Sequence, residues 1–384
     1  MIKLIKNVNV FSPNFIGKKD ILFLWDKIYK IEDDLSDYEK FSDVQIYDFE
    51  GLSMSPGYID IHVHITGGGG EQGYASRTPE IKFSELVSAG VTTVVGLLGT
   101  DGQTRSLENL YAKAKALEEE GMTTFILTGS YSYPSVTLTG DIKRDIMFND
   151  KIIGAKVAIS DHRSSHLQKN ELLKIISEAR LGGMLSNKAG LTVFHLGDHD
   201  RGICQLMELI EEYPIKVANL LPTHIGRNET LFSQSIEYMN KGGYVDFTVD
   251  LEDEEITARQ IAEALSKGDF IDNITMSTDS CGSVPKFDEE GNCIGLSYVL
   301  PNIISREMRL LTKEYNVSIE NAIQFITLNP AKRLKVDHYK GKIQAGYDAD
   351  AVVFDENFNI HHVFAKGECV VFNKETMKKG KFEN

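Results

Sequence analysis

The chain has 384 residues, of which 42% are hydrophobic and 25% are charged, a composition typical of a folded globular protein and not of a disordered one. Its 41 basic and 56 acidic residues give a formal charge of −15, which disfavours nucleic acid and anionic membranes as partners. The length allows several domains, or one barrel with a small companion domain.

The first residues form no sustained apolar run and no cleavage site of small residues, so we expect no signal peptide. No window approaches ~18 consecutive apolar residues, so we also expect no membrane span. The cysteines are scattered without a CxxC spacing, which is typical of free thiols in a reducing compartment. These features together predict a cytoplasmic protein.

Both ends of the chain are rich in Val, Ile, Phe and Tyr and are broken by turn residues, which predicts short strands within 2–10, 20–31, 44–49, 342–355 and 360–373. Neither end is long enough to bury a core alone. We therefore predict a small β-sandwich domain made of residues 1–55 plus 340–384, with a second domain, 56–339, inserted between them.

Within the inserted segment, short apolar runs alternate with amphipathic stretches. The runs predict strands at 58–65, 91–98, 124–128, 152–159, 191–195, 216–224, 244–249 and 273–277. The amphipathic stretches predict helices at 106–120, 170–181, 202–212, 231–241 and 257–267. This order predicts an α/β protein with a TIM-like (β/α)8 barrel. A doubly wound open sheet is the competing arrangement, but no GxGxxG or Walker loop follows the first strand.

Side chains that can bind metal follow the predicted strands. His62 and His64 lie two residues apart in one strand, so both imidazoles point to the same side. Further candidates lie on or at the ends of later strands, namely Lys156, His195, His224 and Asp279. The carboxyl ends of barrel strands meet at one mouth, where the active sites of such barrels lie. We therefore expect these side chains to form one site.

This set resembles the pattern of the amidohydrolase superfamily, which has an HxH pair, a strand-4 lysine, two further histidines and a strand-8 aspartate. The stretches 67–71 (GGGGE), 99–101 (GTD), 158–163 (AISDHR) and 221–224 (LPTH) also resemble those of isoaspartyl (β-aspartyl) dipeptidases. The resemblance covers nearly the whole chain. It implies a binuclear metal-dependent dipeptidase that hydrolyses the β-linked amide by attack of metal-bound hydroxide.

By the same resemblance, two divalent ions, most suitably zinc, would be held by His62, His64, His195, His224 and Asp279, with Lys156 carboxylated by CO2 to a bridging carbamate. Burial beside cations would keep the Lys156 amine neutral for this reaction. Asp279 would also act as the base, and Tyr131 would polarise the substrate carbonyl. A large homo-oligomer, such as an octamer, is implied as well.

A β-aspartyl dipeptide carries one ammonium and two carboxylates, so its site needs an anion and at least one fork-shaped cation. Glu71 suits the ammonium, and Arg163 and Arg227 suit the carboxylates. The remaining substrate-binding candidates would add hydrogen bonds, namely Gly69, Thr100 and Ser283.

Two segments at the rim of the predicted pocket depart from the dipeptidase pattern. The chain has Ile-Gly-Arg at 225–227, where the family more usually has Val-Asn-Arg, and Ser-Cys-Gly-Ser at 280–283, where it more often has Gly-Asn-Gly-Ser. A cyclic amidase of the dihydropyrimidinase or dihydroorotase type is the alternative enzyme, since it shares the metal ligands. A metal-free barrel serving as an interaction protein is the alternative from another class. Cys281 is interpreted as a packing residue or as a reactive thiol.

Overall fold

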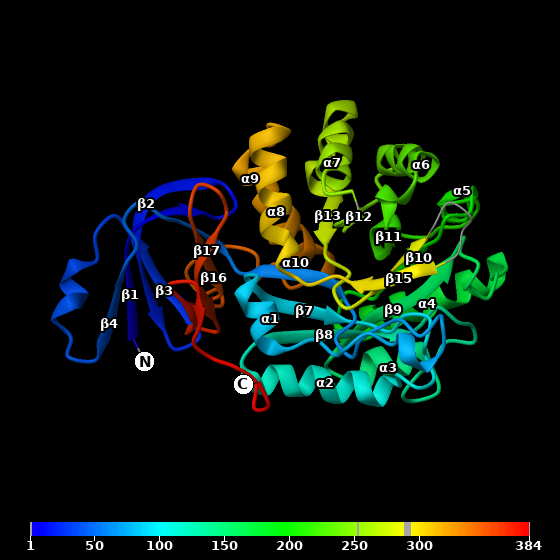
Figure 1. The fold of residues 1–384 in the computed structure, drawn as a ribbon, viewed down its shortest axis with the longest axis horizontal. Coiled ribbons are helices and arrows are strands. Elements are labelled where there is room, and N and C mark those ends of the chain that lie inside the picture. The colour runs from blue at the N-terminus through cyan, green and yellow to red at the C-terminus, as the bar shows by residue number, and fades with distance from the viewer. Residues whose placement is uncertain (1, 252, 288–292, 384) are drawn as a thin grey trace.

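The computed structural model describes residues 2–251, 253–287 and 293–383. The predicted barrel is confirmed, because the inserted segment forms a parallel eight-stranded sheet whose strands follow in chain order from β6 to β13. Helices cover its outside, and the strands of the two termini lie together at one end of the molecule (Figure 1). The barrel strands are β6 (Tyr58–Val63), β7 (Val91–Gly96), β8 (Thr123–Gly129), β9 (Ile152–Ile159), β10 (Leu191–Leu196), β11 (Leu220–Thr223), β12 (Val245–Thr248) and β13 (Ile274–Ser277).

The helices pack their apolar sides on this sheet. In α2, for example, the Ser106 side chain caps the N-terminus by accepting from the Asn109 backbone, and Gly121 ends the helix in a left-handed conformation. The helices are α1 (Phe83–Ser88), α2 (Leu107–Glu120), α3 (Ile142–Phe148), α4 (Lys169–Ser186), α5 (Cys204–Glu212), α6 (Glu229–Asn240), α7 (Ile256–Lys267), α8 (Ile303–Arg309), α9 (Ile319–Ile326) and α10 (Leu328–Leu334). Among the residues that the structure covers, no helix is long and apolar enough to cross a bilayer.

Two predicted elements of the barrel differ from the structure by more than two residues at one end. The strand expected at 216–224 is only Leu220–Thr223, because Val217–Asn219 form a 3-10 turn before it. Helix α4 continues five residues beyond the predicted end at Leu181, through Gly182 and Gly183. A β-carbon on Gly182 would lie 3.0 Å from the Ile146 side chain, so a glycine here lets α3 and α4 pack closely. Close packing thus outweighs the low helix propensity of glycine.

The two ends of the chain share one nine-stranded sheet, in which β5 pairs with both β1 and β16. Side chains such as Ile5, Phe23, Met54 and Phe364 form its core. The strands are β1 (Ile2–Phe11), β2 (Phe15–Leu24), β3 (Lys27–Glu32), β4 (Val44–Asp48), β5 (Ser53–Pro56), β16 (Ala351–Phe354), β17 (Ile360–Ala365), β18 (Glu368–Phe372) and β19 (Glu375–Thr376).

The barrel closes where β6 meets the segment after β13. The ladder between them is reduced to a bridge of Val63 with Ser280, supported by the bond from the His64 backbone N–H to the Ser280 carbonyl, 2.9 Å. The Asp60 carboxylate adds a link across this seam, because it accepts from the backbone N–H of His62 and from the hydroxyl and N–H of Thr278. The two ends of the sheet are therefore joined mainly near the barrel mouth.

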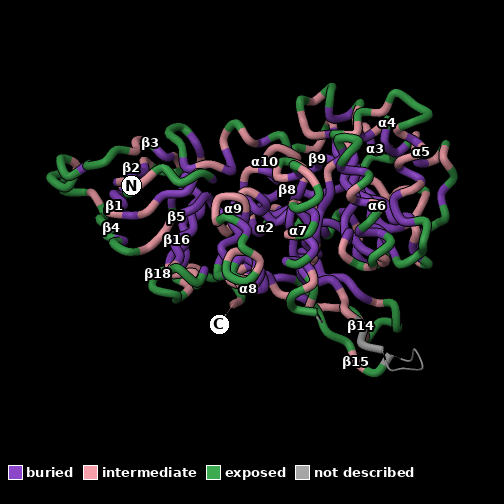
Figure 2. Tube along the Cα trace, turned by 90° about the horizontal axis from the view of Figure 1, so that it is seen from above, coloured by how far each residue is buried: buried purple, intermediate pink, exposed green. Residues whose placement is uncertain are grey.

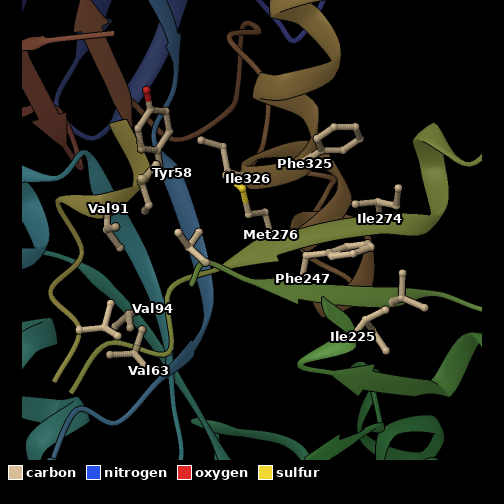
Figure 3. Close-up of a cluster of buried hydrophobic side chains, with 14 of the residues drawn as sticks. Tyr58, Val63, Val91, Val94, Ile225, Phe247, Ile274, Met276, Phe325 and Ile326 are labelled. Carbon is tan, nitrogen blue, oxygen red and sulfur yellow. The ribbon is translucent and has the colours of Figure 1, made fainter. Parts of the chain in front are cut away.

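Apolar side chains fill the space between the sheet and the helices around this seam. Figure 3 shows Phe325 and Ile326 of α9 beside Met276 of β13 and Tyr58 of β6, all of which are buried. A two-stranded hairpin, β14 (Ser283–Phe287) with β15 (Cys293–Tyr298), projects from the barrel (Figure 2). Because β14 follows Asp279 directly, the hairpin stands beside the candidate site.

Candidate active site

The predicted metal ligands come together at the carboxyl ends of the barrel strands. His62 lies on β6 and His64 follows it, Lys156 lies on β9 and His195 on β10, and His224 and Asp279 follow β11 and β13. His224 and Asp279 have positive φ angles of 64° and 53°, which residues other than glycine rarely adopt. This strained turn marks where the chain leaves each strand.

These side chains are close enough to share ions. Asp279 Oδ1 lies 3.2 Å from His64 Nε2 and 3.4 Å from His62 Nε2. Lys156 Nζ lies 2.8 Å from the same His62 nitrogen. His62, His224 and Asp279 each offer a ligand atom within 4.8 Å of the others.

The hydrogen bonding of this cluster fits metal binding. Among the described residues, the buried atoms His64 Nδ1 and His224 Nε2 have no hydrogen-bond partner, and buried polar atoms are rarely left in this state. The other ring nitrogen of His224 lies 2.9 Å from the Thr248 hydroxyl, which orients the ring. Burial lowers the pKa of three of these histidines well below the usual value for histidine, namely His62, His195 and His224. Their rings are therefore neutral and can act as ligands.

Lys156 is fully buried, and burial lowers the pKa of its amine to about 7. A large fraction of this amine is therefore uncharged at neutral pH and available as a nucleophile. Burial raises the pKa of Asp279, but His62 and His64 outweigh this effect and hold it below the usual range. Asp279 is therefore ionised and can bind a cation or accept a proton.

His195 has partners on both ring nitrogens. Its Nδ1 lies 2.6 Å from Tyr131 Oη, and its Nε2 lies 2.9 Å from Asp161 Oδ2. An ion at His195 would therefore replace one of these two contacts. Asp161 was not among the residues singled out in the sequence, although it lies in the 158–163 stretch.

The candidate substrate residues form a second cluster beside the first. Glu71 accepts from Thr100 Oγ1 at 3.0 Å, from Arg163 Nη1 at 3.2 Å and from Ser283 Oγ at 3.2 Å. These partners come from segments after different barrel strands, since Thr100 follows β7, Arg163 follows β9 and Ser283 begins β14. These three hydrogen bonds hold the Glu71 carboxylate in place.

The glycine-rich loop that carries Glu71 is held by Arg105, which sequence reasoning missed. This buried guanidinium donates to the carbonyls of Thr66, Gly68 and Thr78. Gly69 has a φ of 72°, and a β-carbon there would lie 2.4 Å from the Ser76 carbonyl, so only glycine fits.

The two candidate arginines differ in how they are engaged. Arg163 donates to both oxygens of Asp161, at 2.8–2.9 Å, as well as to Glu71. Arg227 approaches Asp161 and Asp198 only to 3.9 Å and 3.7 Å, beyond hydrogen-bonding distance. Arg227 is therefore the guanidinium more open to a new carboxylate.

Both clusters line one cavity of about 590 Å³, which we call the substrate cavity. Its wall includes Gly69, Glu71, Thr100, Tyr131, Arg163, His195, Arg227, Asp279, Ser283 and Leu296. An anion, cations and metal-binding groups thus face the same space, as expected for a site that binds a small zwitterion and hydrolyses it.

Comparison with known proteins agrees with this geometry. The model of the amidohydrolase family matches residues 53–370. The chain belongs to this family. Among solved structures, the β-aspartyl dipeptidase of Fervidobacterium islandicum AW-1, in complex with a β-Asp-Leu dipeptide, is 47% identical, with a TM-score of 0.92 over 100% of both chains. The resemblance to β-aspartyl dipeptidases is therefore confirmed.

Other similar proteins are more distant. The D-hydantoinase (dihydropyrimidinase) from Thermus sp. is 17% identical, with a TM-score of 0.71 over 99% of this chain and 97% of that one, which shows a shared fold alone. The adenine deaminase of Clostridium perfringens is 24% identical over 387 residues, and the match covers 99% of this chain but only 60% of the deaminase. The cyclic amidase alternative is thus supported by fold and not by close similarity.

The two segments that depart from the dipeptidase pattern, 225–227 and 280–283, have different surroundings. Cys281 is buried, and burial raises the pKa of its thiol to about 12, which favours the interpretation as a packing residue over that as a reactive thiol. Its carbonyl accepts from the Gly68 backbone and the Thr78 hydroxyl, which ties it to the glycine-rich loop. At the other departure, a β-carbon on Gly226 would lie 2.3 Å from Gln260 Oε1. A larger residue there would have to displace Gln260.

Proposed function

We propose that the protein is a binuclear metal-dependent dipeptidase that hydrolyses the β-linked amide of β-aspartyl dipeptides. The observation that carries this proposal is the position of Glu71. It lies beside the metal-binding cluster and within 3.2 Å of Arg163, so that one anion and one cation are adjacent. The α-ammonium and α-carboxylate of a β-aspartyl residue share a carbon atom and need such an adjacent pair. The 47% identity to a β-aspartyl dipeptidase supports the same substrate class.

We further propose that His62, His64, His195, His224 and Asp279 hold two divalent ions, with a carbamate on Lys156 between them. The nitrogen-rich donor set favours zinc. When bound, the ions would polarise the amide carbonyl and lower the pKa of water. The buried, partly neutral amine of Lys156 supports the carbamate, because only an uncharged amine attacks CO2.

The chain's own residues would then move protons and orient the amide. Asp279, ionised and fixed between His62 and His64, would accept a proton from the nucleophilic water and deliver it to the leaving nitrogen. Burial raises the pKa of Tyr131, so its hydroxyl remains protonated and can donate to the oxygen on which negative charge develops. To do so, it would exchange its contact with His195.

Substrate binding follows from the charges in the cavity. Glu71 would bind the ammonium, and Arg163, Thr100 and Ser283 would bind the adjacent carboxylate, with Gly69 allowing close approach of the backbone. Arg227 would then remain for the carboxylate of the leaving residue.

The proposal is tested by hydrolysis of β-Asp-Leu and α-Asp-Leu, with metal content measured on the same sample. In the α-linked dipeptide a neutral amide replaces the carboxylate beside Glu71, so a donor that the bound substrate shields from water is left unpaired, at a cost of about 1–3 kcal/mol. With the displaced carbonyl as a second loss, we expect a preference of about a hundredfold or more for the β-linkage. Equal rates on the two dipeptides would contradict the proposal, as would hydrolysis of a cyclic imide alone.

We also propose a homo-oligomer. Four large apolar side chains are 46–68% exposed on the adjacent helices α3 and α4, namely Phe148, Leu181, Met184 and Leu185. Exposed apolar groups of this kind favour contacts between protein chains. Light scattering of the purified protein measures the mass, and a monomer at all concentrations would contradict this part of the proposal.

A further inference from the structure

The Asp161 carboxylate is buried behind the wall of the substrate cavity. Asp161 is the second residue after β9, and a β-carbon on Gly197, the first residue after β10, would lie 2.4 Å from its α-carbon. The two strand ends therefore meet at this carboxylate. It lines a neighbouring hollow of about 540 Å³ but not the substrate cavity, so it does not face the space for a dipeptide. Any role in the reaction must pass through the residues that it contacts.

One of these residues is Arg163, which Asp161 holds by three hydrogen bonds. The backbone N–H and Nε of Arg163 donate to Asp161 Oδ1 at 2.7 Å and 2.9 Å, and Nη2 donates to Oδ2 at 2.8 Å. A guanidinium bound to both oxygens of a carboxylate is fixed in direction as well as in position. The remaining nitrogen, Nη1, is the one that reaches Glu71, at 3.2 Å. Asp161 thereby sets the direction from which Arg163 can meet a carboxylate beside Glu71.

The same carboxylate contacts the ring of His195. Asp161 Oδ2 lies 2.9 Å from His195 Nε2. A carboxylate bound by a guanidinium has lone pairs and no proton to offer, so a lone pair on Nε2 would be repelled at this distance. Nε2 therefore carries the ring hydrogen and donates it to Asp161. Arg163 Nη2 lies farther from this nitrogen, at 3.4 Å, and already donates to Asp161.

The lone pair of the His195 ring is then on Nδ1. This nitrogen faces Tyr131 Oη at 2.6 Å, and Tyr131 lines the substrate cavity. Of the two contacts that an ion at His195 would replace, the contact with Tyr131 is the one whose loss leaves Asp161 in place. A histidine that binds a metal usually donates its other ring N–H to a partner such as a carboxylate, which holds the ring in one orientation.

We propose that Asp161 is a positioning residue for two sites at once, because it directs Arg163 toward the α-carboxylate of the substrate and holds the His195 ring for an ion. This inference rests on the proposed function. Asp161 would touch neither the substrate nor the ion. Its loss should therefore weaken the binding of both without removing any group that reacts.

The effect on Arg163 is tested with β-Ala-Leu, which is β-Asp-Leu without the α-carboxylate. In Asp161→Asn the NH2 group replaces one carboxylate oxygen, and at either position it meets a donor of Arg163. In zinc-loaded protein, the wild type should prefer β-Asp-Leu, and the ratio of the two kcat/KM values should fall by about threefold to tenfold in the variant, because an arginine that is not held loses side-chain freedom on binding. Loss of zinc or of packing would slow both substrates alike and leave this ratio unchanged.

The effect on His195 is tested by zinc affinity, measured on metal-free protein by competition with a chelator. Asp161→Asn should bind zinc about tenfold more weakly or worse than the wild type. Asp161→Ser, whose side chain is smaller and cannot clash, should show the same fall in affinity and in the substrate ratio. This second variant decides the question if Asp161→Asn does not fold.

The matched control is Asp145→Asn, since Asp145 of α3 is also fully buried in the barrel domain. Its carboxylate accepts from the hydroxyls of Thr128 and Thr139 and from the backbone N–H groups of Leu138 and Thr139. None of these residues is a predicted metal ligand or substrate-binding residue. The control should keep the substrate ratio and the zinc affinity of the wild type.

An unchanged substrate ratio or an unchanged zinc affinity in the Asp161 variants would overturn the inference, as would equal changes in the control. Failure of both variants to fold would also overturn it, since the carboxylate would then serve the stability of the fold. In these cases the wild type still hydrolyses β-Asp-Leu and the proposed function stands. A wild type that hydrolyses neither dipeptide would refute the proposed function itself.

Discussion

Replacing Arg227 with methionine should separate substrate binding from stability. Arg227 is partly exposed, and its ion pairs with Asp161 and Asp198 are 3.9 Å and 3.7 Å long. Such contacts contribute at most about 1 kcal/mol to the free energy of unfolding. A bidentate bond to a substrate carboxylate contributes more, because each hydrogen bond to a charged group adds about 1.5–3 kcal/mol. Two bonds of the weaker kind correspond to about 3 kcal/mol, or roughly a hundredfold in kcat/KM.

The assay compares β-Asp-Leu with its C-terminal amide, which lacks the leaving residue's carboxylate. The wild type should prefer the acid by about a hundredfold, and Arg227→Met should lose this preference by slowing the acid alone. Arg201→Met is the matched control, since Arg201 lies near the same mouth, is paired with Glu208 at 3.6 Å and does not line the substrate cavity. A loss of equal size on acid and amide would refute the role of Arg227 in binding this carboxylate.

Further predictions concern Lys156, Glu307 and Cys281. Lys156→Ala should lower metal content and reduce kcat by orders of magnitude, and added short carboxylic acids should restore part of the activity. An unmodified ammonium on Lys156 in active, metal-loaded wild-type protein would contradict the carbamate. Burial raises the pKa of Glu307 to about 7. The free energy of unfolding should therefore fall as pH rises from about 4.5 to about 7. Glu307→Gln should remove this fall, and chemical denaturation at pH 8 should show the variant to be more stable by about 3 kcal/mol. Cys281 should resist alkylation by iodoacetamide in the native protein at pH 7.5, as read by mass spectrometry, because burial raises its pKa to about 12.

The barrel could be predicted because few folds bury the apolar faces of strands and helices that alternate along the chain. The positions of His62 and His64 followed from the two-residue period of a strand, and the convergence of strand ends placed the later ligands nearby. Arg105 could not be recognised in this way, since its partners Thr66 and Gly68 lie 39 and 37 residues earlier in the chain. A guanidinium that binds backbone carbonyls leaves no pattern in residue types.

The same limit applies to Asp161. Its contact with His195, which lies 34 residues later in the chain, depends on how two strand ends face one another, and a local motif does not specify this. The last five residues of α4 were not predicted because glycine has a low helix propensity. Only the contact of Gly182 with α3 explains why the helix continues.

The seam between β6 and β13 would give the proposed ions a mechanical role in addition to their chemistry. His62 lies on β6 and His64 directly follows it on one side of this seam, and Asp279 follows β13 on the other. An ion bound by all three residues would link the first and last strands of the barrel. Since a ligand that binds only the folded state raises the free energy of unfolding, metal loading should tighten the barrel. Amide hydrogen exchange at His64, which donates across the seam, would report this tightening directly.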